Sequence, residues 1–166
     1  MMALHPVFVH FHTGIGAATA VLALVNILFR LVFRDGIRTP GTRMAKLFHE
    51  FDIFIFWGNV ITFLGLIVGM WSGFVDWPMV ALVNDPYMRF KILWSAVGFQ
   101  IYIFLILLRA KLGDRVWDKT SSFLTYGIGV VVAGVLMIIL AAMGGIAVYG
   151  ESILEPVIDW LGLPWP

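Results

Sequence analysis

Residues 122–149 read SFLTYGIGVVVAGVLMIILAAMGGIAVY, a stretch that contains no charged side chain. A helix needs about 20 predominantly apolar residues to cross a bilayer, so this stretch predicts a transmembrane helix. Three more apolar stretches of sufficient length lie near residues 9–33, 49–75 and 90–109. The sequence therefore predicts an all-α integral membrane four-helix bundle that occupies residues 1–166 as a single transmembrane domain.

The composition supports this class and excludes others. The chain has 166 residues, of which 61% are hydrophobic and 13% charged, whereas a soluble domain is about half apolar and a quarter charged. Its net charge of +1 offers no basic surface for nucleic acid. The chain has no cysteine, which excludes disulfides, thiolate zinc sites and cysteine-ligated iron–sulfur clusters.

The distribution of basic residues predicts an orientation. The loop after the first stretch and the loop before the last are rich in lysine and arginine: Arg34, Arg38, Arg43 and Lys46, and Arg109, Lys111, Arg115 and Lys119. Basic loops remain in the cytoplasm, so we expect both termini and the 76–89 loop outside. No signal peptide is apparent, and residues 150–166, with Trp160 and Trp165, are expected to form a short segment at the outer interface.

Small and polar residues within the stretches indicate where helices meet. Gly65, Gly69 and Gly73 are spaced by four and share one helix face, which is typical of close helix packing or of a thin slot for a flat cofactor. Arg30 and Asp52 near the cytoplasmic ends could pair with each other across the first two helices or contribute to a proton path. The main polar residues within the stretches are Asn26, Arg30, Asp52, Asn59, Thr62, Ser95 and Gln100.

The four histidines are candidate ligands for haem or for a metal ion. His5, His10 and His12 lie at the outer end of the first helix, and His49 lies at the cytoplasmic end of the second. With a rise of 1.5 Å per residue, His12 and His49 are separated by about 25 Å and cannot bind one iron. His5 and His12 are about 10 Å apart along the axis, so no two outer histidines of a regular helix sandwich one haem.

The residues that share a helix face with each histidine suggest which one points inward. His12 continues a small and polar stripe through Gly16, Thr19 and Asn26, which predicts an interior ligand. His10 continues a more apolar stripe that could face lipid or a partner. The alternative for His12 is an interfacial histidine satisfied by water or backbone.

Methionine thioethers could complete a site with histidine for haem or copper, or simply fill gaps in the core. Those expected on the outer side are Met70, Met79, Met88 and Met143, of which Met70 and Met143 are the candidate partners. His49 and Asp52 are three residues apart on one helix face, which suits a carboxylate-oriented imidazole at a metal or pigment site, or a plain interface pair. No hydrolytic or phosphoryl-transfer motif occurs, so no catalytic residue is predicted and an enzymatic role stays open.

The N-terminal stretch His5-Pro6-Val7-Phe8-Val9-His10-Phe11, followed by Thr13-Gly14-Ile15-Gly16, resembles the signature His-Pro-x-x-Val-His-Phe-Pro-Ile-Gly. That signature belongs to a four-helix membrane family catalogued as domain of unknown function 2231. The ending Gly73-Phe74-Val75-Asp76-Trp77 is also similar to that family's Gly-x-x-Asp-Trp pattern. The chain departs from the family in having His12 at a proline position and no histidine in Tyr87–Lys91, near the start of the third helix.

The resemblance implies a redox setting, because some family members are fused to or encoded beside Rieske-type or cytochrome proteins. It favours His5 and His10 as ligands, whereas the helix pattern favours His12. We therefore expect a redox-associated subunit that binds haem b near the outer face and relays electrons between quinol and a partner protein. The alternatives are a cofactor-free anchoring subunit of a membrane complex and an outer-face copper-handling protein.

The expected setting is a prokaryotic cytoplasmic membrane crossed several times by the chain. The expected partners are the lipid bilayer, quinone, and other subunits of a redox complex or further copies of the chain. Nucleic acid is not among them.

Overall fold

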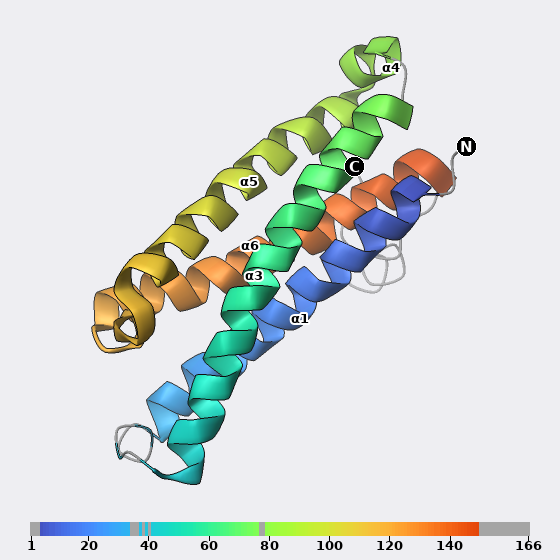
Figure 1. Ribbon diagram of the computed structural model, residues 1–166. Helices are drawn as coiled ribbons and strands as arrows, with labels where there is room; N and C mark the ends of the chain where they lie inside the picture. The colour runs from blue at the N-terminus through green and yellow to red at the C-terminus, as the bar shows by residue number, and fades with distance from the viewer. Residues whose placement is uncertain (1–3, 34–36, 38, 40, 77–78, 150–166) are drawn as a thin grey trace, which may run out of the picture.

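The computed structural model describes residues 4–33, 37, 39, 41–76 and 79–149, and within these ranges it contains helices and no strand (Figure 1). The four long helices of this part are α1 (Leu4–Val32), α3 (Arg43–Asp76), α5 (Pro86–Leu112) and α6 (Thr120–Tyr149). The predicted all-α four-helix bundle is confirmed. The predicted interfacial segment 150–166 lies outside the described residues.

Each long helix contains a segment long and apolar enough to span a membrane, as a multi-pass membrane protein requires. The four segments found in the described ranges are Val9–Val32, Arg43–Val75, Met88–Trp117 and Thr120–Met143. Large apolar side chains such as Trp57, Leu64 and Leu107 are exposed on the outward faces, where lipid would cover them. The second and third segments extend further toward the loops than the sequence predicted, because polar residues there continue the helices.

Neighbouring helices run in opposite directions, and their main contacts close a ring. Helix α1 packs against α3 and α6, and α5 packs against the same two helices (Figure 1). One end of the bundle carries the loops between α1 and α3 and between α5 and α6, and we call it the basic end. The other carries the start of α1, the end of α6 and the short helix α4 (Met79–Asn84), and we call it the α4 end.

The ends of α5 follow from local sequence signals. The Asp85 side chain accepts a hydrogen bond from the backbone N–H of Met88 at 3.3 Å, and Pro86 occupies the first helical position. At the other end Gly113 has a φ of 57°, a left-handed conformation that stops an α-helix. A 3-10 helix, η1 (Gly113–Trp117), follows directly and turns two buried side chains, Val116 and Trp117, toward the core.

Glycine allows α1 and α6 to approach each other closely. A Cβ added at Gly134 of α6 would overlap the Cβ of Ala20 and would lie 2.9 Å from the backbone oxygen of Gly16. Because one of these neighbours is backbone, the contact cannot be relieved by turning a side chain. The close approach of these two helices therefore depends on the absence of a side chain at Gly134.

We expect Gly134→Ala to lower the free energy of unfolding by about 1–3 kcal/mol, because overpacking forces the two helices apart. The matched control is Gly14→Ala, because a Cβ at Gly14 meets no atom within 4 Å. The measurement is unfolding by denaturing detergent in mixed micelles. Equal stability of the two variants would contradict the close packing.

Candidate functional site

The His12 side chain lies buried between α1 and α3, with 4% of its surface exposed. A Cβ on Gly69 would lie 3.0 Å from His12 Cε1, and a Cβ on Gly65 would overlap the His12 Cβ. Two of the three glycines in the predicted stripe, Gly65 and Gly69, therefore leave the room that the imidazole of His12 occupies. This supports the close-packing interpretation at Gly65 and Gly69, where the histidine fills the space that faces the two glycines.

A pocket lies beside His12 at the α4 end of the bundle. Its cavity volume is about 80 Å³, or about 690 Å³ when the space open to the surroundings is counted, and all four long helices contribute to its wall. The wall is mainly apolar with few polar groups, and the residues that bear on its chemistry are His12, Met70, Met88, Lys91, Ser95 and Met137. We call it the His12 pocket.

The structure brings together only some of the predicted ligands. His12 and Met70 line the same pocket, and so does Met88, which is 4% exposed. His10 is exposed on α1, and Met143 is partly buried on α6; neither lines the pocket. His5 lies in the first turn of α1, with its side chain outside the described part.

The pocket also contains groups that were not predicted from the sequence. Met137 reaches it from the interior of α6, and Lys91 from the start of α5. The signal for Lys91 was available, because a cation within a membrane span marks a functional candidate by default. Met137 has no such signal, since a methionine in an apolar helix is indistinguishable from core packing.

The donor atoms of the His12 pocket fit two kinds of group. An imidazole and a thioether together are a known pair of ligands for haem iron. Thioethers also favour Cu(I). In the described part of the chain His12 is the one histidine that lines the pocket, so this part does not supply a bis-histidine haem site within one chain.

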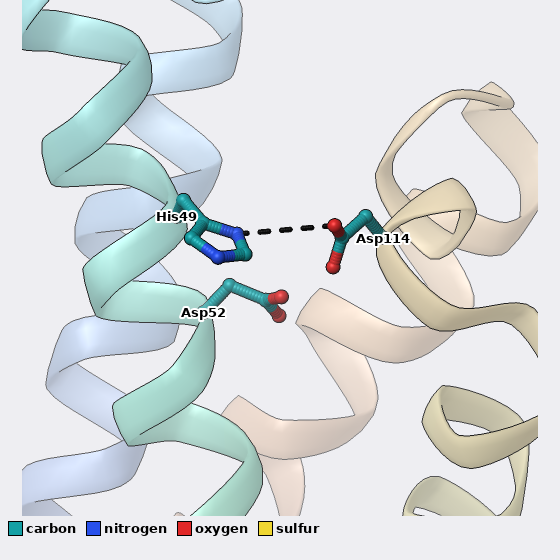
Figure 2. A group of neighbouring side chains, drawn as sticks. All are labelled: His49, Asp52 and Asp114. Atoms are coloured by element: carbon teal, nitrogen blue, oxygen red, sulfur yellow. Dashed lines mark ion pairs between the residues drawn. The ribbon is translucent and has the colours of Figure 1, made fainter.

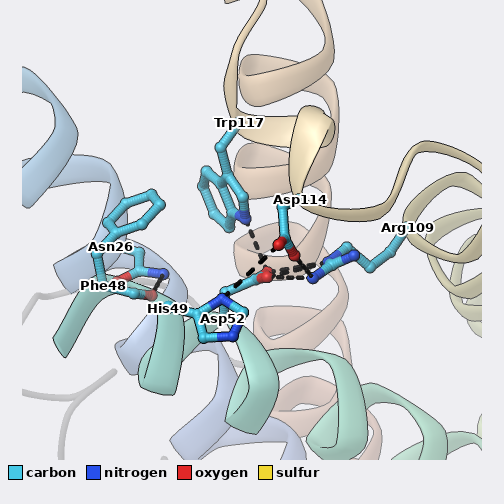
Figure 3. A network of polar contacts seen from close by, with 7 residues as sticks. All are labelled: Asn26, Phe48, His49, Asp52, Arg109, Asp114 and Trp117. Carbon is cyan, nitrogen blue, oxygen red and sulfur yellow. Dashed lines mark hydrogen bonds and ion pairs between the residues drawn. The ribbon is translucent and has the colours of Figure 1, made fainter. Parts of the chain in front are cut away.

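A second polar site lies at the basic end, centred on the carboxylate of Asp52. Asp52 is 1% exposed, and both of its oxygens accept hydrogen bonds from Arg109 Nε at 3.1 Å, with Arg109 Nη2 adding a further contact (Figure 3). Trp117 Nε1 donates to the same carboxylate at 2.7 Å. These contacts connect α3, α5 and η1.

The predicted pairing of Asp52 with Arg30 is wrong. The guanidinium of Arg109 on α5 takes that position, because its planar fork reaches both carboxylate oxygens at once. Arg30 donates instead to the backbone oxygen of Asp118 at 2.8 Å, and its guanidinium lies 4.8 Å from the centre of the Phe123 ring. Arg30 thus joins α1 to the loop between α5 and α6.

His49 and Asp114 extend this network toward the surface. Arg109 Nη2 donates to Asp114 Oδ1 at 2.8 Å, and His49 Nδ1 lies 3.9 Å from Asp114 Oδ2 (Figure 2). One ligand atom from each of His49, Asp52 and Asp114 falls within 4.8 Å of the others, a grouping that could hold a metal ion. Both carboxylates already accept from Arg109, whose positive charge opposes a cation. The arrangement therefore favours a structural ion-pair network over a metal site at His49.

The chain matches no protein-family model, no characterised protein and no solved structure in comparisons of sequence and fold. The resemblance of its N-terminal stretch to the four-helix membrane family therefore stays a prediction. The geometry defines the class of the molecule, a four-helix membrane bundle with a pocket at one end and an ion-pair network at the other.

We expect Asp52→Asn to lower the free energy of unfolding by about 3–5 kcal/mol, because it leaves the largely buried guanidinium of Arg109 without its main counter-charge. Asp114→Asn is the matched control and should cost about 0–1 kcal/mol, since Asp114 is exposed. Detergent unfolding of both variants checks the difference. Similar losses for the two would show that the buried pair does not anchor the basic end.

Proposed function

We propose that the protein is a redox-associated membrane subunit that holds a b-type haem in the His12 pocket and relays electrons between quinol and a partner protein. The observation that carries this proposal is the buried His12 imidazole in a pocket shared with Met70, Met88 and Met137. Haem, when bound, supplies one-electron transfer.

Each residue of the pocket has a role in this proposal. His12 would ligate the iron, and its packing against Gly65 and Gly69 holds the imidazole in place. Met70 is the candidate second ligand, as the sequence suggested. The ammonium of Lys91 offsets the charge of the acidic side groups of haem, and the apolar wall excludes water.

A copper-handling role is the second candidate, favoured by the number of thioethers around one imidazole. A cofactor-free anchoring subunit is the third, favoured by the apolar outward faces, which suit contact with lipid, with other subunits or with further copies of the chain. The haem proposal leads because Met70 and the imidazole of His12 lie at one pocket.

We expect detergent-purified protein to contain stoichiometric haem with a b-type α-band in its reduced-minus-oxidised spectrum. His12→Ala should abolish this band, because it removes the axial ligand. His10→Ala is the matched control and should retain the band, because His10 is exposed and lies outside the pocket. Metal analysis of the same samples tests the copper alternative.

The outcomes separate the three candidates. Bound copper without haem would replace the first proposal with the second. A folded protein that binds neither, even when purified with its partners, would leave the anchoring role. Haem retained in His12→Ala would overturn the assignment of the ligand.

We also propose that the basic end faces the cytoplasm of a prokaryotic cell and that the α4 end faces outward, following the positive-inside rule. The chain has no cysteine, so single cysteines report sidedness without background. A membrane-impermeant maleimide applied to intact spheroplasts should label Val83→Cys at the α4 end and leave Lys119→Cys at the basic end unlabelled. The reverse pattern would invert the orientation.

A further inference from the structure

The buried polar side chains of the bundle follow its long axis. Seven residues make nearly two helical turns, so residues at that spacing stay on one face. Three such rows run inside the bundle. The row on α1 consists of His12, Thr19 and Asn26, the row on α3 of Asp52 and Asn59, and the row on α5 of Ser95, Tyr102 and Arg109. All are buried apart from Arg109, whose side chain is 12% exposed. We call these rows, with Thr62 and Tyr126, the polar axis.

Next to the His12 pocket, Thr62 of α3 and Tyr102 of α5 both approach Gly16 of α1. A Cβ added there would lie 3.1 Å from Thr62 Cγ2, 3.2 Å from the Tyr102 hydroxyl and 3.3 Å from Met137 Cγ. Met137 also lines the pocket. The hydroxyl of Tyr102 and the side chain of Thr62 therefore gather at one level, directly next to the wall of the pocket.

Toward the basic end, Tyr126 of α6 links the axis to the ion-pair network. Its side chain is fully buried, and its hydroxyl lies near Asp52, Arg109 and Asn59. The hydroxyl lies next to Asn59 without forming a hydrogen bond of ordinary geometry. The axis thus continues from Asn59 through Tyr126 to the carboxylate of Asp52.

Several polar atoms of the axis have no protein partner. In the described part of the chain, these are both amide atoms of Asn59, the hydroxyl of Tyr126 and Oδ1 of Asn26. Leaving such groups unsatisfied in a low-dielectric interior is costly, and buried water is their usual partner. Asn59 and Tyr126 together offer donors and acceptors to a water molecule.

Helix association explains only part of the axis, since Asn26 donates to the backbone oxygen of Phe48 at 3.3 Å and Arg109 donates to Asp52. Polar side chains that hold membrane helices together do so by bonding across to a neighbouring helix. Thr19 and Thr62 bond instead to backbone oxygens of their own helices, those of Ile15 at 2.7 Å and Gly58 at 2.8 Å. Asn59 lies beside Tyr126 of α6 but makes no hydrogen bond of ordinary geometry to it.

We infer that water bound at Asn59 and Tyr126 completes a proton-transfer path along the polar axis, between the ion-pair network at the basic end and the His12 pocket. Each hydroxyl or water accepts one proton and releases another, so one proton enters at one end as one leaves at the other. Only O–H bonds break and form, and no oxidant or reductant takes part. At the basic end the two carboxylates of Asp52 and Asp114 outnumber the single guanidinium of Arg109. This excess of negative charge favours a proton at the entry of the path. The inference does not depend on a cofactor in the pocket.

The test is proton flux into vesicles that contain the purified protein and a trapped pH-sensitive dye. After an external acid pulse, with the membrane potential clamped by potassium and valinomycin, wild-type vesicles should equilibrate faster than protein-free vesicles. Tyr126→Phe should return the rate to that of protein-free vesicles, because it removes the hydroxyl while keeping the ring. Asn59→Leu should do the same by removing the water site.

Gln100→Leu is the matched control, because Gln100 is a polar residue within the α5 membrane span that is exposed and lies off the axis. It should keep the wild-type rate. The inference is overturned if wild-type vesicles equilibrate no faster than protein-free vesicles, or if Tyr126→Phe keeps the wild-type rate. Tyr126→Phe alone decides the test if Asn59→Leu fails to fold.

Hydration can be tested separately by solid-state NMR of the protein in bilayers. Magnetisation transfer from water to the side-chain amide of Asn59 should be observed in the wild type. Its absence, with transfer to the exposed amide of Asn84 at the α4 end intact, would show that the axis is dry and would overturn the inference. Neither measurement reads haem content or electron transfer, so their failure is distinct from a failure of the proposed function.

Discussion

The ion pair between Asp52 and Arg109 is the constraint on which the basic end of the bundle depends. A carboxylate with almost no exposure inside a membrane bundle requires a counter-charge and hydrogen-bond donors from the protein itself. Arg109 and the indole N–H of Trp117 provide both. To reach Asp52, α5 must end and turn at Gly113, and η1 must present Trp117 inward. The position of the α5–α6 connection thus follows from one buried charge.

At the α4 end the constraint is steric rather than electrostatic. Gly65 and Gly69 leave room for the His12 imidazole, and Gly134 lets the backbones of α1 and α6 approach. The helices therefore hold together where side chains are smallest, and the His12 pocket lies beside this contact. The polar axis runs between the two ends and connects the ion-pair network at the basic end with the mainly apolar His12 pocket.

The fold was largely predictable from the sequence, and the sites only in part. Uninterrupted apolar stretches define helices in a membrane because backbone groups have no other partner there. The inward position of His12 followed from its small and polar stripe. The partner of Asp52 did not follow, because Arg30 and Arg109 lie at the same end and only the packing of α5 distinguishes them. Met137 was also beyond prediction, since nothing in its local sequence separates a pocket wall from the core.

The contact of His12 with two glycines has a consequence for the energetics of ligand binding. A side chain that must be immobilised on binding loses rotational freedom, and that loss subtracts from affinity. The His12 ring is already held by Gly65 and Gly69, so its orientation is preorganised before any ligand arrives. A ligand bound through this imidazole would meet a rigid donor, and selectivity would then depend on how well its shape matches a fixed direction of approach.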